Sequence, residues 1–456
     1  MHDSTLASPY VTPKTAPGPR SWLGLSVARD FQKDPMGLLE RSREEWGDVV
    51  RVPMGFVDMY LLAHPDAVKH VLQDNHVNYR KGFDYQRMEP LVGHGLLTSN
   101  GEEWKRHRRL AQPAFHRQRI AGFGATMVKR TQEALERWRG LPAGEVVDLH
   151  AEMMRLTLEV VGDALFSQDL GAVTGKVAKA MDGAMHATNV RLNQLLPLPL
   201  WVPTPFNRRY RKDLAVLDEV VTGIIRERRG KPASDDLLSM LMEARDEGSD
   251  APALDDRALR DEVMTLVLAG HETTANALTF TLLLLHQHPE VREALEAHVA
   301  QALGGRAATA ADVGNLGFAK QVAEEGMRLY PPAWAMGRQA VGDDVIQGFH
   351  VGKGSLVMLC PWLTHRDARF WEEPRRFNPS RFAPDAPARH RFAYFPFGGG
   401  PRLCIGQGFA LMELQLVLAT LAQQVRVEVL QPEKLVLEPL ITLRPKGGLP
   451  ARLHFR

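Results

Sequence analysis

The chain has only two cysteines, Cys360 and Cys404, among its 456 residues. Two thiols are too few for a disulfide framework, so the composition favours a reducing compartment. Long hydrophobic runs are also missing. The nearest approach, residues 277–285, is much shorter than the roughly 20 apolar residues of a membrane-spanning helix and contains two threonines. The sequence therefore predicts a cytoplasmic protein without a membrane anchor.

An excess of charge of one sign is absent as well. Lys and Arg total 56 and Asp and Glu total 54, which leaves a net charge of +2. Such a balance gives no electrostatic basis for binding nucleic acid or a membrane surface. With 44% hydrophobic and 24% charged residues, the composition excludes disordered, collagen-like and coiled-coil proteins. Length alone favours about three domains, although one large domain is equally compatible.

The N-terminus lacks the basic and then apolar segments of a signal peptide, and four prolines fall within the first 19 residues. We expect residues 1–34 to form a Pro-rich, disordered arm and residues 35–456 to form the folded part of the chain.

The pattern of apolar residues predicts a mainly α protein with small β regions. A Pro-rich linker, residues 195–206, separates two of the expected helices. The C-terminal residues 435–455 are expected to form a hairpin that turns at Gly447 and Gly448. The other expected elements are strands at 49–52, 59–62, 345–351 and 356–360, mainly helical structure over 102–302, and a long helix within 254–289.

The most informative segment, residues 397–406, reads FGGGPRLCIG and directly precedes an amphipathic run. A cysteine at a helix N-terminus has a lowered thiol pKa, because backbone N–H groups and the helix dipole favour the thiolate that binds metals. Alone, this segment is equally compatible with an inert cysteine in a Gly-rich turn. A phosphate loop is excluded, because the third glycine of the dinucleotide pattern would fall on Leu403 and no Gly-x-x-x-x-Gly-Lys is present.

The segment resembles the haem-binding loop of the cytochrome P-450 monooxygenases, Phe-x-x-Gly-x-Arg-x-Cys-x-Gly, at every fixed position. The resemblance implies that Cys404 is the axial thiolate ligand of the haem iron, the metal ligand of this chain. It also implies that Arg402 contacts a haem propionate. A thiolate ligand suits this chemistry because its electron donation favours cleavage of the O–O bond.

A second segment places Glu325 and Arg328 three residues apart on one helix face, just before two prolines. Alone, such a pair is typical of a solvated surface. Followed by Arg381 and then Cys404, it resembles the family's order of motifs. The resemblance implies that these two residues and Arg381 form a buried structural triad that supports the haem loop. A buried cluster of this kind is costly unless fully paired, so we assign it to architecture and not to chemistry.

A third segment, residues 269–274, reads AGHETT and matches the family's motif on its long central helix. The resemblance implies catalytic roles for Thr273, as the proton-relay alcohol, and for Glu272, as its acid. Activation of dioxygen needs two protons, and a hydroxyl beside a carboxyl group is suited to relay them. The competing interpretation is a threonine that only bonds to the carbonyl group four residues earlier. A zinc-protease pattern is excluded because position 275 is Ala and not His.

Three further residues match positions at which the family binds haem propionates: Trp104, Arg108 and Arg338. The expected helix that carries Trp104 and Arg108 is strongly basic. Its outer face is a candidate docking site for an acidic electron-transfer protein. The alternative is a solvated surface. The residues of this face are Lys105, Arg106, Arg109 and Arg402.

The family resemblance implies a single large, mainly α catalytic domain over residues 35–456, with a small β region and haem b between two long helices. The expected function is haem-thiolate monooxygenation by O2. The chain has no flavin or iron–sulfur signature. We therefore expect a separate ferredoxin or flavodoxin, with its NAD(P)H reductase, to supply the electrons.

By analogy, an apolar pocket would bind a lipophilic small molecule such as a fatty acid, terpenoid, steroid or macrolide, the first two being preferred. The linker near Leu200 and Trp201 is expected to border this pocket. The residues expected to line it are Phe83, Leu97, Val267, Ala269, Ala333, Met336 and Ile441.

Two other functions remain open from the sequence. A peroxide-driven peroxygenase of the same fold would normally lack the acid and alcohol pair, so Glu272 and Thr273 count against it. A non-catalytic haem protein that binds a small ligand would have no use for a complete oxygen-activation motif.

Overall fold

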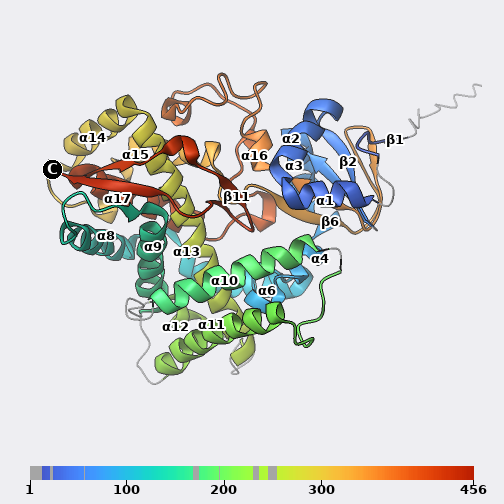
Figure 1. The fold of residues 1–456 in the computed structure, drawn as a ribbon, viewed down its shortest axis with the longest axis horizontal. Coiled ribbons are helices and arrows are strands. Elements are labelled where there is room, and N and C mark those ends of the chain that lie inside the picture. The colour runs from blue at the N-terminus through green and yellow to red at the C-terminus, as the bar shows by residue number, and fades with distance from the viewer. Residues whose placement is uncertain are drawn as a thin grey trace, which may run out of the picture.

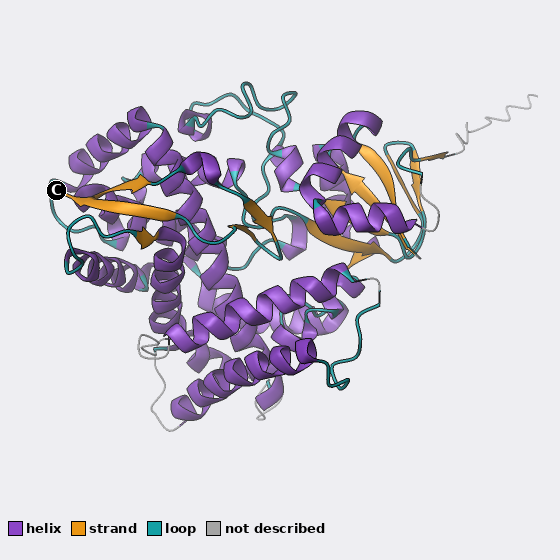
Figure 2. Ribbon diagram, viewed as in Figure 1, coloured by secondary structure: helices purple, strands orange, loops and turns teal. Residues whose placement is uncertain are grey.

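The computed structural model describes residues 13–20, 24–55, 57–167, 174–194, 196–229, 236–244 and 254–456. Within them, helices predominate and the strands form small sheets, as the sequence predicted (Figures 1 and 2). The α-helices are α1 (Leu25–Lys33), α2 (Pro35–Trp46), α3 (Pro65–Lys69), α4 (Phe83–Gln86), α5 (Glu89–Val92), α6 (Gly101–Ala111), α7 (Arg117–Gly122), α8 (Gly124–Arg139), α9 (Leu149–Phe166), α10 (Thr174–Asn193), α11 (Pro205–Arg229), α12 (Leu237–Glu243), α13 (Asp256–Gln287), α14 (Pro289–Leu303), α15 (Gly317–Leu329), α16 (Pro361–Thr364) and α17 (Gln407–Gln424).

The strands belong to separate small sheets. Their bounds are β1 (Lys14–Thr15), β2 (Val49–Met54), β3 (Val57–Leu62), β4 (Tyr79–Arg80), β5 (Val147–Asp148), β6 (Met336–Ala340), β7 (Asp344–Ile346), β8 (Phe349–Val351), β9 (Leu356–Leu359), β10 (Val425–Val429), β11 (Leu437–Pro439), β12 (Leu443–Pro445) and β13 (Pro450–Phe455).

The largest sheet has the strand order β2-β3-β9-β6-β4 and lies with α1, α2 and α3 at one end of the molecule (Figure 1). Strands β2 and β3 are antiparallel, with Val49 opposite Leu62. Val49, Val50 and Val52 of β2 and residues 59–62 of β3 are buried, so successive residues on both faces of the pair are covered. At the other end, β10, β13 and β5 form a sheet near α8, α14 and α17.

Helix α13 runs through the middle of the molecule (Figure 1). The Asp255 side chain accepts a hydrogen bond from the Ala258 N–H at 2.7 Å and caps its first turn. Pro289 follows its end and begins α14. Most of its side chains are buried, and it packs against α9, α15, α17 and α11. A helix so enclosed positions any polar group in its middle rigidly.

Two expectations about the chain ends are wrong for the described residues. Residues 13–20 and 24–34 are ordered and not a loose arm. Strand β1 pairs with β8, and the Arg51 N–H donates to the Pro17 carbonyl group at 2.8 Å. Prolines do not prevent an extended edge strand from pairing. Residues 1–12 lie outside the described part of the chain.

The C-terminal segment does not form one hairpin around Gly447 and Gly448. Strands β11 and β12 pair with each other around a turn at residues 440–442, whereas β13 pairs with β10 and β5. The two glycines, both with positive φ, redirect the chain from one sheet to the other. In the described residues, no helix is long and apolar enough to cross a membrane.

Candidate active site

Cys404 lies in the loop that leads into α17, and its side chain is exposed. Backbone bonds shape the loop: the Cys404 N–H donates to the Phe397 carbonyl group at 3.0 Å, and the Leu403 N–H donates to that of Gly400 at 3.1 Å. Gly400 has a φ of +63°, and a Cβ there would lie 1.8 Å from the Leu72 carbonyl oxygen. Only glycine fits that position, so the sequence requirement at Gly400 has a steric cause.

The two thiols have different surroundings. Burial raises the pKa of Cys404, while backbone N–H groups of Gly406 and Gln407 and the Arg108 charge lower it. The thiol is accessible, yet it lies deep enough among protein atoms to lose much of its solvation. Cys360 is fully buried, donates to the Trp334 carbonyl group, and burial raises its pKa to about 12. Only Cys404 has both access and groups that stabilise a thiolate.

Arg108 and Arg402 hold the two sides of this loop. The Arg108 guanidinium donates to the Leu403 carbonyl oxygen at 2.8 Å. Arg402 donates to the Ser99 carbonyl oxygen at 2.9 Å. Its guanidinium carbon also lies 4.1 Å from the centre of the Trp104 ring, a cation–π contact. The Arg402 side chain is thus turned inward, and the expectation that it belongs to an exposed docking face is wrong.

Arg402 belongs to a cluster of positive side chains near the loop. Burial, the Arg338 charge and the Arg402 charge lower the pKa of Lys81 well below its usual value. Burial and the Arg338 charge likewise lower the pKa of Arg402 to about 10. The carboxyl group that acts on Lys81 among the described residues is that of Asp84, whose own pKa is raised by burial. Three cations that repel one another in a buried site lack a matching set of anions.

Sequence reasoning missed Lys81 and Tyr85 in this cluster. The Lys81 ammonium group lies 3.6 Å from the centre of the Tyr85 ring. Asn100 ties the parts together, because its Oδ1 accepts from the Lys81 N–H at 2.9 Å and from Arg402 at 3.2 Å. No spacing pattern marks these residues, since they join the site only through tertiary contacts.

The middle of α13 is not buried on every face. Ala269 is exposed and Thr273 is half-buried, although the residues around them on this central helix are mostly buried. The two lie four residues apart and therefore share one helix face. Thr273 Oγ donates to the Ala269 carbonyl oxygen at 2.6 Å. This is the local bond that the competing interpretation expected, but it leaves the hydroxyl oxygen free to accept another hydrogen bond.

Glu272 is 2% exposed, and its Oε1 accepts from the Thr442 hydroxyl group at 2.7 Å. Its Oε2 is buried without a hydrogen-bond partner in the described structure. Burial raises the pKa of Glu272, and the Thr442 bond and the Arg444 charge lower it only in part. An acid with a raised pKa retains a proton at higher pH, as a proton donor requires.

The structure brings Glu325, Arg328 and Arg381 together. Arg328 donates to both carboxylate oxygens of Glu325, at 2.6 and 2.7 Å, and neither residue is exposed. Arg381 Nε lies 3.4 Å from Glu325 Oε1. The remaining Arg328 donors bond to the carbonyl groups of His365, Pro374 and Arg376. The cluster is therefore paired on nearly every side, as a buried ion pair must be.

The residues expected to line the pocket fall on several elements. Val267 and Ala269 lie on α13, Met336 begins β6, and Ile441 lies in the turn between β11 and β12. Met336 Sδ would lie 3.9 Å from a Cβ at Gly398, so it borders the Cys404 loop. The others are half-buried: Phe83 in α4, and Leu97 and Ala333 in loops. In contrast, Trp201 is 77% exposed and does not line an interior site.

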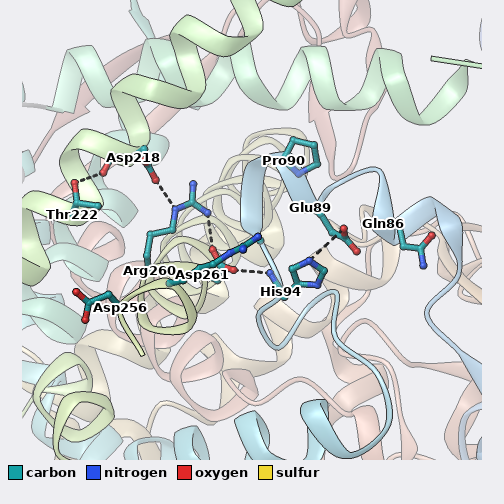
Figure 3. Close-up of a pocket in the computed structure, with 11 residues that line it drawn as sticks. Gln86, Glu89, Pro90, His94, Asp218, Thr222, Asp256, Arg260 and Asp261 are labelled. Atoms are coloured by element: carbon teal, nitrogen blue, oxygen red, sulfur yellow. Dashed lines mark hydrogen bonds and ion pairs between the residues drawn. The ribbon is translucent and has the colours of Figure 1, made fainter. Parts of the chain in front are cut away.

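A separate cavity of about 640 Å³ lies between α5, α11 and the start of α13 (Figure 3). Arg260 crosses it and donates to Asp218 at 2.6 Å and to Asp261 at 2.9 Å. His94 donates its backbone N–H to Asp261 and lies beside Glu89 (Figure 3). This polar cavity contains none of the predicted site residues.

These observations fit haem b. An accessible thiol at the start of a helix suits an iron ligand, and a buried cation cluster short of anions suits two propionate groups. Lys81, Arg338 and Arg402 would hold the propionates, and Arg108 would support the thiolate.

Comparison with known proteins agrees with this site. The family model described as "Cytochrome P450" matches residues 13–450. Cyclooctatin synthase of Streptomyces melanosporofaciens is 35% identical over 87% of this chain and 86% of its own length. Cyclooctat-9-en-7-ol 5-monooxygenase of the same organism is 34% identical over 91% and 90%. Pentalenene oxygenase of Streptomyces avermitilis is 33% identical over 91% of each chain. With a family model covering almost its whole length, the chain belongs to the cytochrome P450 family and is a haem b monooxygenase.

Proposed function

We propose that Cys404 is the thiolate that ligates the haem iron of this enzyme. The observation that carries the proposal is the contrast in burial between the two thiols: backbone N–H groups stabilise both, but Cys404 is accessible, whereas Cys360 is buried and donates its own proton to Trp334. When bound, thiolate-ligated haem supplies the chemistry that cleaves the O–O bond of dioxygen. In this proposal Trp104 supports the propionate-binding Arg402 through its ring.

The overall reaction combines a substrate C–H bond, O2, two electrons and two protons, and yields a C–OH group and water. Glu272 supplies a proton from its Oε2, which has no hydrogen-bond partner among the residues that the structure describes. Thr273 passes the proton on through its hydroxyl group. The hydroxyl hydrogen is donated to the Ala269 carbonyl oxygen, which leaves the hydroxyl oxygen able to accept a hydrogen bond. Glu272 itself is buried, whereas Thr273 is half-buried on the open face of α13, where it can receive the proton.

We infer a terpenoid substrate. The names of two relatives, pentalenene oxygenase and cyclooctat-9-en-7-ol 5-monooxygenase, denote oxidation of carbon-rich molecules that contain an alkene. The candidate lining residues Val267, Ala269, Met336 and Ile441 are apolar and suit such a molecule. Among the four substrate classes that the sequence left open, this favours terpenoids over fatty acids, steroids and macrolides.

The electrons come from a separate protein, for which we propose a ferredoxin or flavodoxin with its NAD(P)H reductase. The exposed cations Lys105, Arg106 and Arg109 lie on α6, whose Arg108 reaches the Cys404 loop. An acidic partner is therefore drawn to the side of the protein nearest the thiolate. We further propose that one domain, including the ordered residues from 13 onward, carries the whole activity.

Substrate binding and turnover test this function. The purified ferric enzyme is titrated with cyclic terpene hydrocarbons and, separately, with a saturated fatty acid, and the Soret absorbance is recorded. Turnover with a surrogate ferredoxin and reductase then uses ¹⁸O2. We expect a terpene to shift the Soret band and to yield an alcohol or epoxide that contains one ¹⁸O atom. Oxidation of the fatty acid alone would contradict the substrate class, and product formation only with added hydrogen peroxide would indicate a peroxygenase.

A further inference from the structure

A chain of hydrogen bonds ends on Glu272 and comes from parts of the sequence far from it. Thr442 lies in the turn between β11 and β12, and its hydroxyl group donates to Glu272 Oε1 at 2.7 Å. Asn276, one helical turn beyond Glu272 on α13, donates its Nδ2 to Thr442 Oγ at 3.1 Å. His150, at the start of α9, contacts Asn276 Oδ1 through Nε2 at 2.9 Å. Three elements thus meet at one carboxyl group.

Asn276 presents its Oδ1 to His150 and its Nδ2 to Thr442, and with this orientation each hydrogen bond has one direction. A carboxamide oxygen only accepts, so His150 must carry its hydrogen on Nε2. The Asn276 amide nitrogen only donates, so Thr442 receives that bond and has its own hydrogen left for Glu272. Each hydrogen therefore points to the next group along the chain, and the last one, from Thr442, points to Glu272 Oε1. Since a carboxamide does not exchange protons as hydroxyl groups do, the chain orients the carboxyl group and does not conduct to it.

The residues of this hydrogen-bond chain that lie nearest Glu272 are buried. Glu272, Asn276 and Thr442 are 2%, 0% and 6% exposed, so water does not replace a lost bond easily. With Oε1 engaged as an acceptor, a proton on Glu272 resides on Oε2, the oxygen without a partner. The position of the acid's proton is thus set by a residue 170 positions away.

We propose that Thr442, held by Asn276 and His150, is a positioning residue that fixes the Glu272 carboxyl group with its proton on Oε2, ready for release during oxygenation. The inference rests on the function proposed above for Glu272. Thr442 adjoins Ile441, so the turn that borders the substrate pocket also holds the acid.

Other charges act on this carboxyl group from neighbouring elements. Arg444 of β12 favours the ionised form and Asp182 of α10 opposes it. Arg444 is itself paired with Asp182 at 2.6 Å and with Glu438 at 2.8 Å. Asp148 acts on His150 at the far end of the chain. Thr442 is not a partner in any of these pairs, so its replacement by valine directly removes two bonds, the one to Glu272 and the one from Asn276.

The test uses infrared difference spectroscopy of the resting holoenzyme during a pH titration. Glu272→Gln identifies the carboxylic C=O band of Glu272, and Glu413→Gln removes that of Glu413, another buried acid with a raised pKa. In Thr442→Val we expect the Glu272 band to move to higher frequency and its titration midpoint to move to higher pH, because a bond that lowers the pKa is lost. Thr442→Ser restores both. Thr279→Val is the matched control, since within the described part of the chain this buried hydroxyl group bonds only to the carbonyl group of Ala275.

Coupling is measured beside the spectrum as product and hydrogen peroxide formed per NAD(P)H. We expect Thr442→Val to release at least about threefold more peroxide and Thr442→Ser to match the wild type. His150→Phe, at the half-buried end of the hydrogen-bond chain, should shift the Glu272 band in the same direction by a smaller amount. This variant replaces Thr442→Val in the test if Thr442→Val does not fold. An unchanged band, or a shifted band with unchanged coupling, would overturn the proposal. Absence of any oxygenated product from the wild type would defeat the proposed function instead, while leaving the spectral test intact.

Discussion

At the scale of single residues, position decides what identical groups do. Thr273 and Thr279 both donate to the carbonyl group four residues earlier on α13, at 2.6 and 2.7 Å. Thr279 is fully buried, whereas Thr273 lies on the exposed face beside Ala269. The local bond therefore does not distinguish a catalytic threonine from a structural one. The exposure of the side chain does distinguish them.

Replacing Thr273 with alanine removes the proposed relay while leaving the thiolate and the propionate cluster intact. General acid catalysis contributes about 10²-fold or more, so we expect the yield of product per NAD(P)H to fall by at least about tenfold. The electrons should appear as hydrogen peroxide. Product and peroxide are measured together in a turnover with limiting NAD(P)H.

Thr279→Ala is the control for the loss of a hydroxyl group from the same helix, and it should keep the wild-type coupling. If Thr273→Ala also kept that coupling, Thr273 would have no relay role and its bond to Ala269 would be purely structural.

At the scale of elements, the triad joins α15 to the segment that precedes the Cys404 loop. Gly326 lets α15 approach α13 closely, since a Cβ there would lie 2.3 Å from Thr281 Oγ. Arg328 then reaches three backbone carbonyl groups as well as Glu325. A Lys at this position would lack the planar set of donors that makes these bonds together.

Arg328→Ala leaves the Glu325 carboxylate buried and without its main partner, which costs about 3–5 kcal/mol. We expect the variant to lose that much free energy of unfolding or to fail to retain haem, measured by urea denaturation and by Soret absorbance. Arg376→Ala breaks an exposed pair of the same spacing, to Glu373 at 2.9 Å, and should cost less than about 1 kcal/mol. Equal costs for the two variants would contradict the structural role of the triad.

Helix α17 contains a second buried acid, Glu413, whose two carboxylate oxygens have no partner in the described structure. Burial raises the pKa of Glu413 well above the usual value for a glutamate side chain, about 4.3. Above that pH the unfolded chain loses the proton and the folded chain keeps it. The free energy of unfolding therefore falls as pH rises, by up to about 1.4 kcal/mol per pH unit, until the pH passes the folded pKa.

Glu413→Gln removes this dependence because an amide does not titrate. Between about pH 6 and pH 8, we expect the free energy of unfolding of the variant to rise relative to that of the wild type. Urea denaturation monitored by far-UV circular dichroism measures both values. Parallel curves for the two proteins would show that Glu413 does not hold a proton in the folded state.

At the scale of the whole molecule, the sequence was informative wherever a pattern is local. The loop around Cys404, the pair Glu325 and Arg328, and the motif at Glu272 and Thr273 are contiguous, and their spacing reflects helix and turn geometry. The long helix expected within 254–289 is α13. The mainly α fold with small sheets follows from the same local patterns.

What the sequence did not predict depends on contacts between distant segments. Lys81 joins Arg338 and Arg402 only because β4 pairs with β6. Thr442 reaches Glu272 only because β11 and β12 form their own hairpin, which the expected turn at 447–448 would have excluded. The choice of which strands pair leaves no periodic signal that a single sequence reveals.

The electron-transfer face is a property of the whole surface. Replacing Lys105, Arg106 and Arg109 with Glu reverses the charge of the outer face of α6. We expect reduction by an acidic ferredoxin to slow by at least about tenfold at low ionic strength, with the difference shrinking as salt is added. Stopped-flow reduction under carbon monoxide measures this rate.

The matched control reverses three exposed cations on another helix, Arg208, Arg209 and Lys212 of α11. It should leave the reduction rate close to that of the wild type. If both triple variants slowed reduction equally, the effect would come from net charge and not from a docking face on α6.

The central claim, that Cys404 is the thiolate ligand of haem, is tested most directly by the carbon-monoxide difference spectrum of the reduced protein. The wild type and Cys360→Ser should both show the Soret band characteristic of thiolate-ligated haem. Cys404→Ser should lose that band. The haem content of each protein is measured separately as the control. A thiolate-type band that survives in Cys404→Ser and disappears in Cys360→Ser would contradict the account.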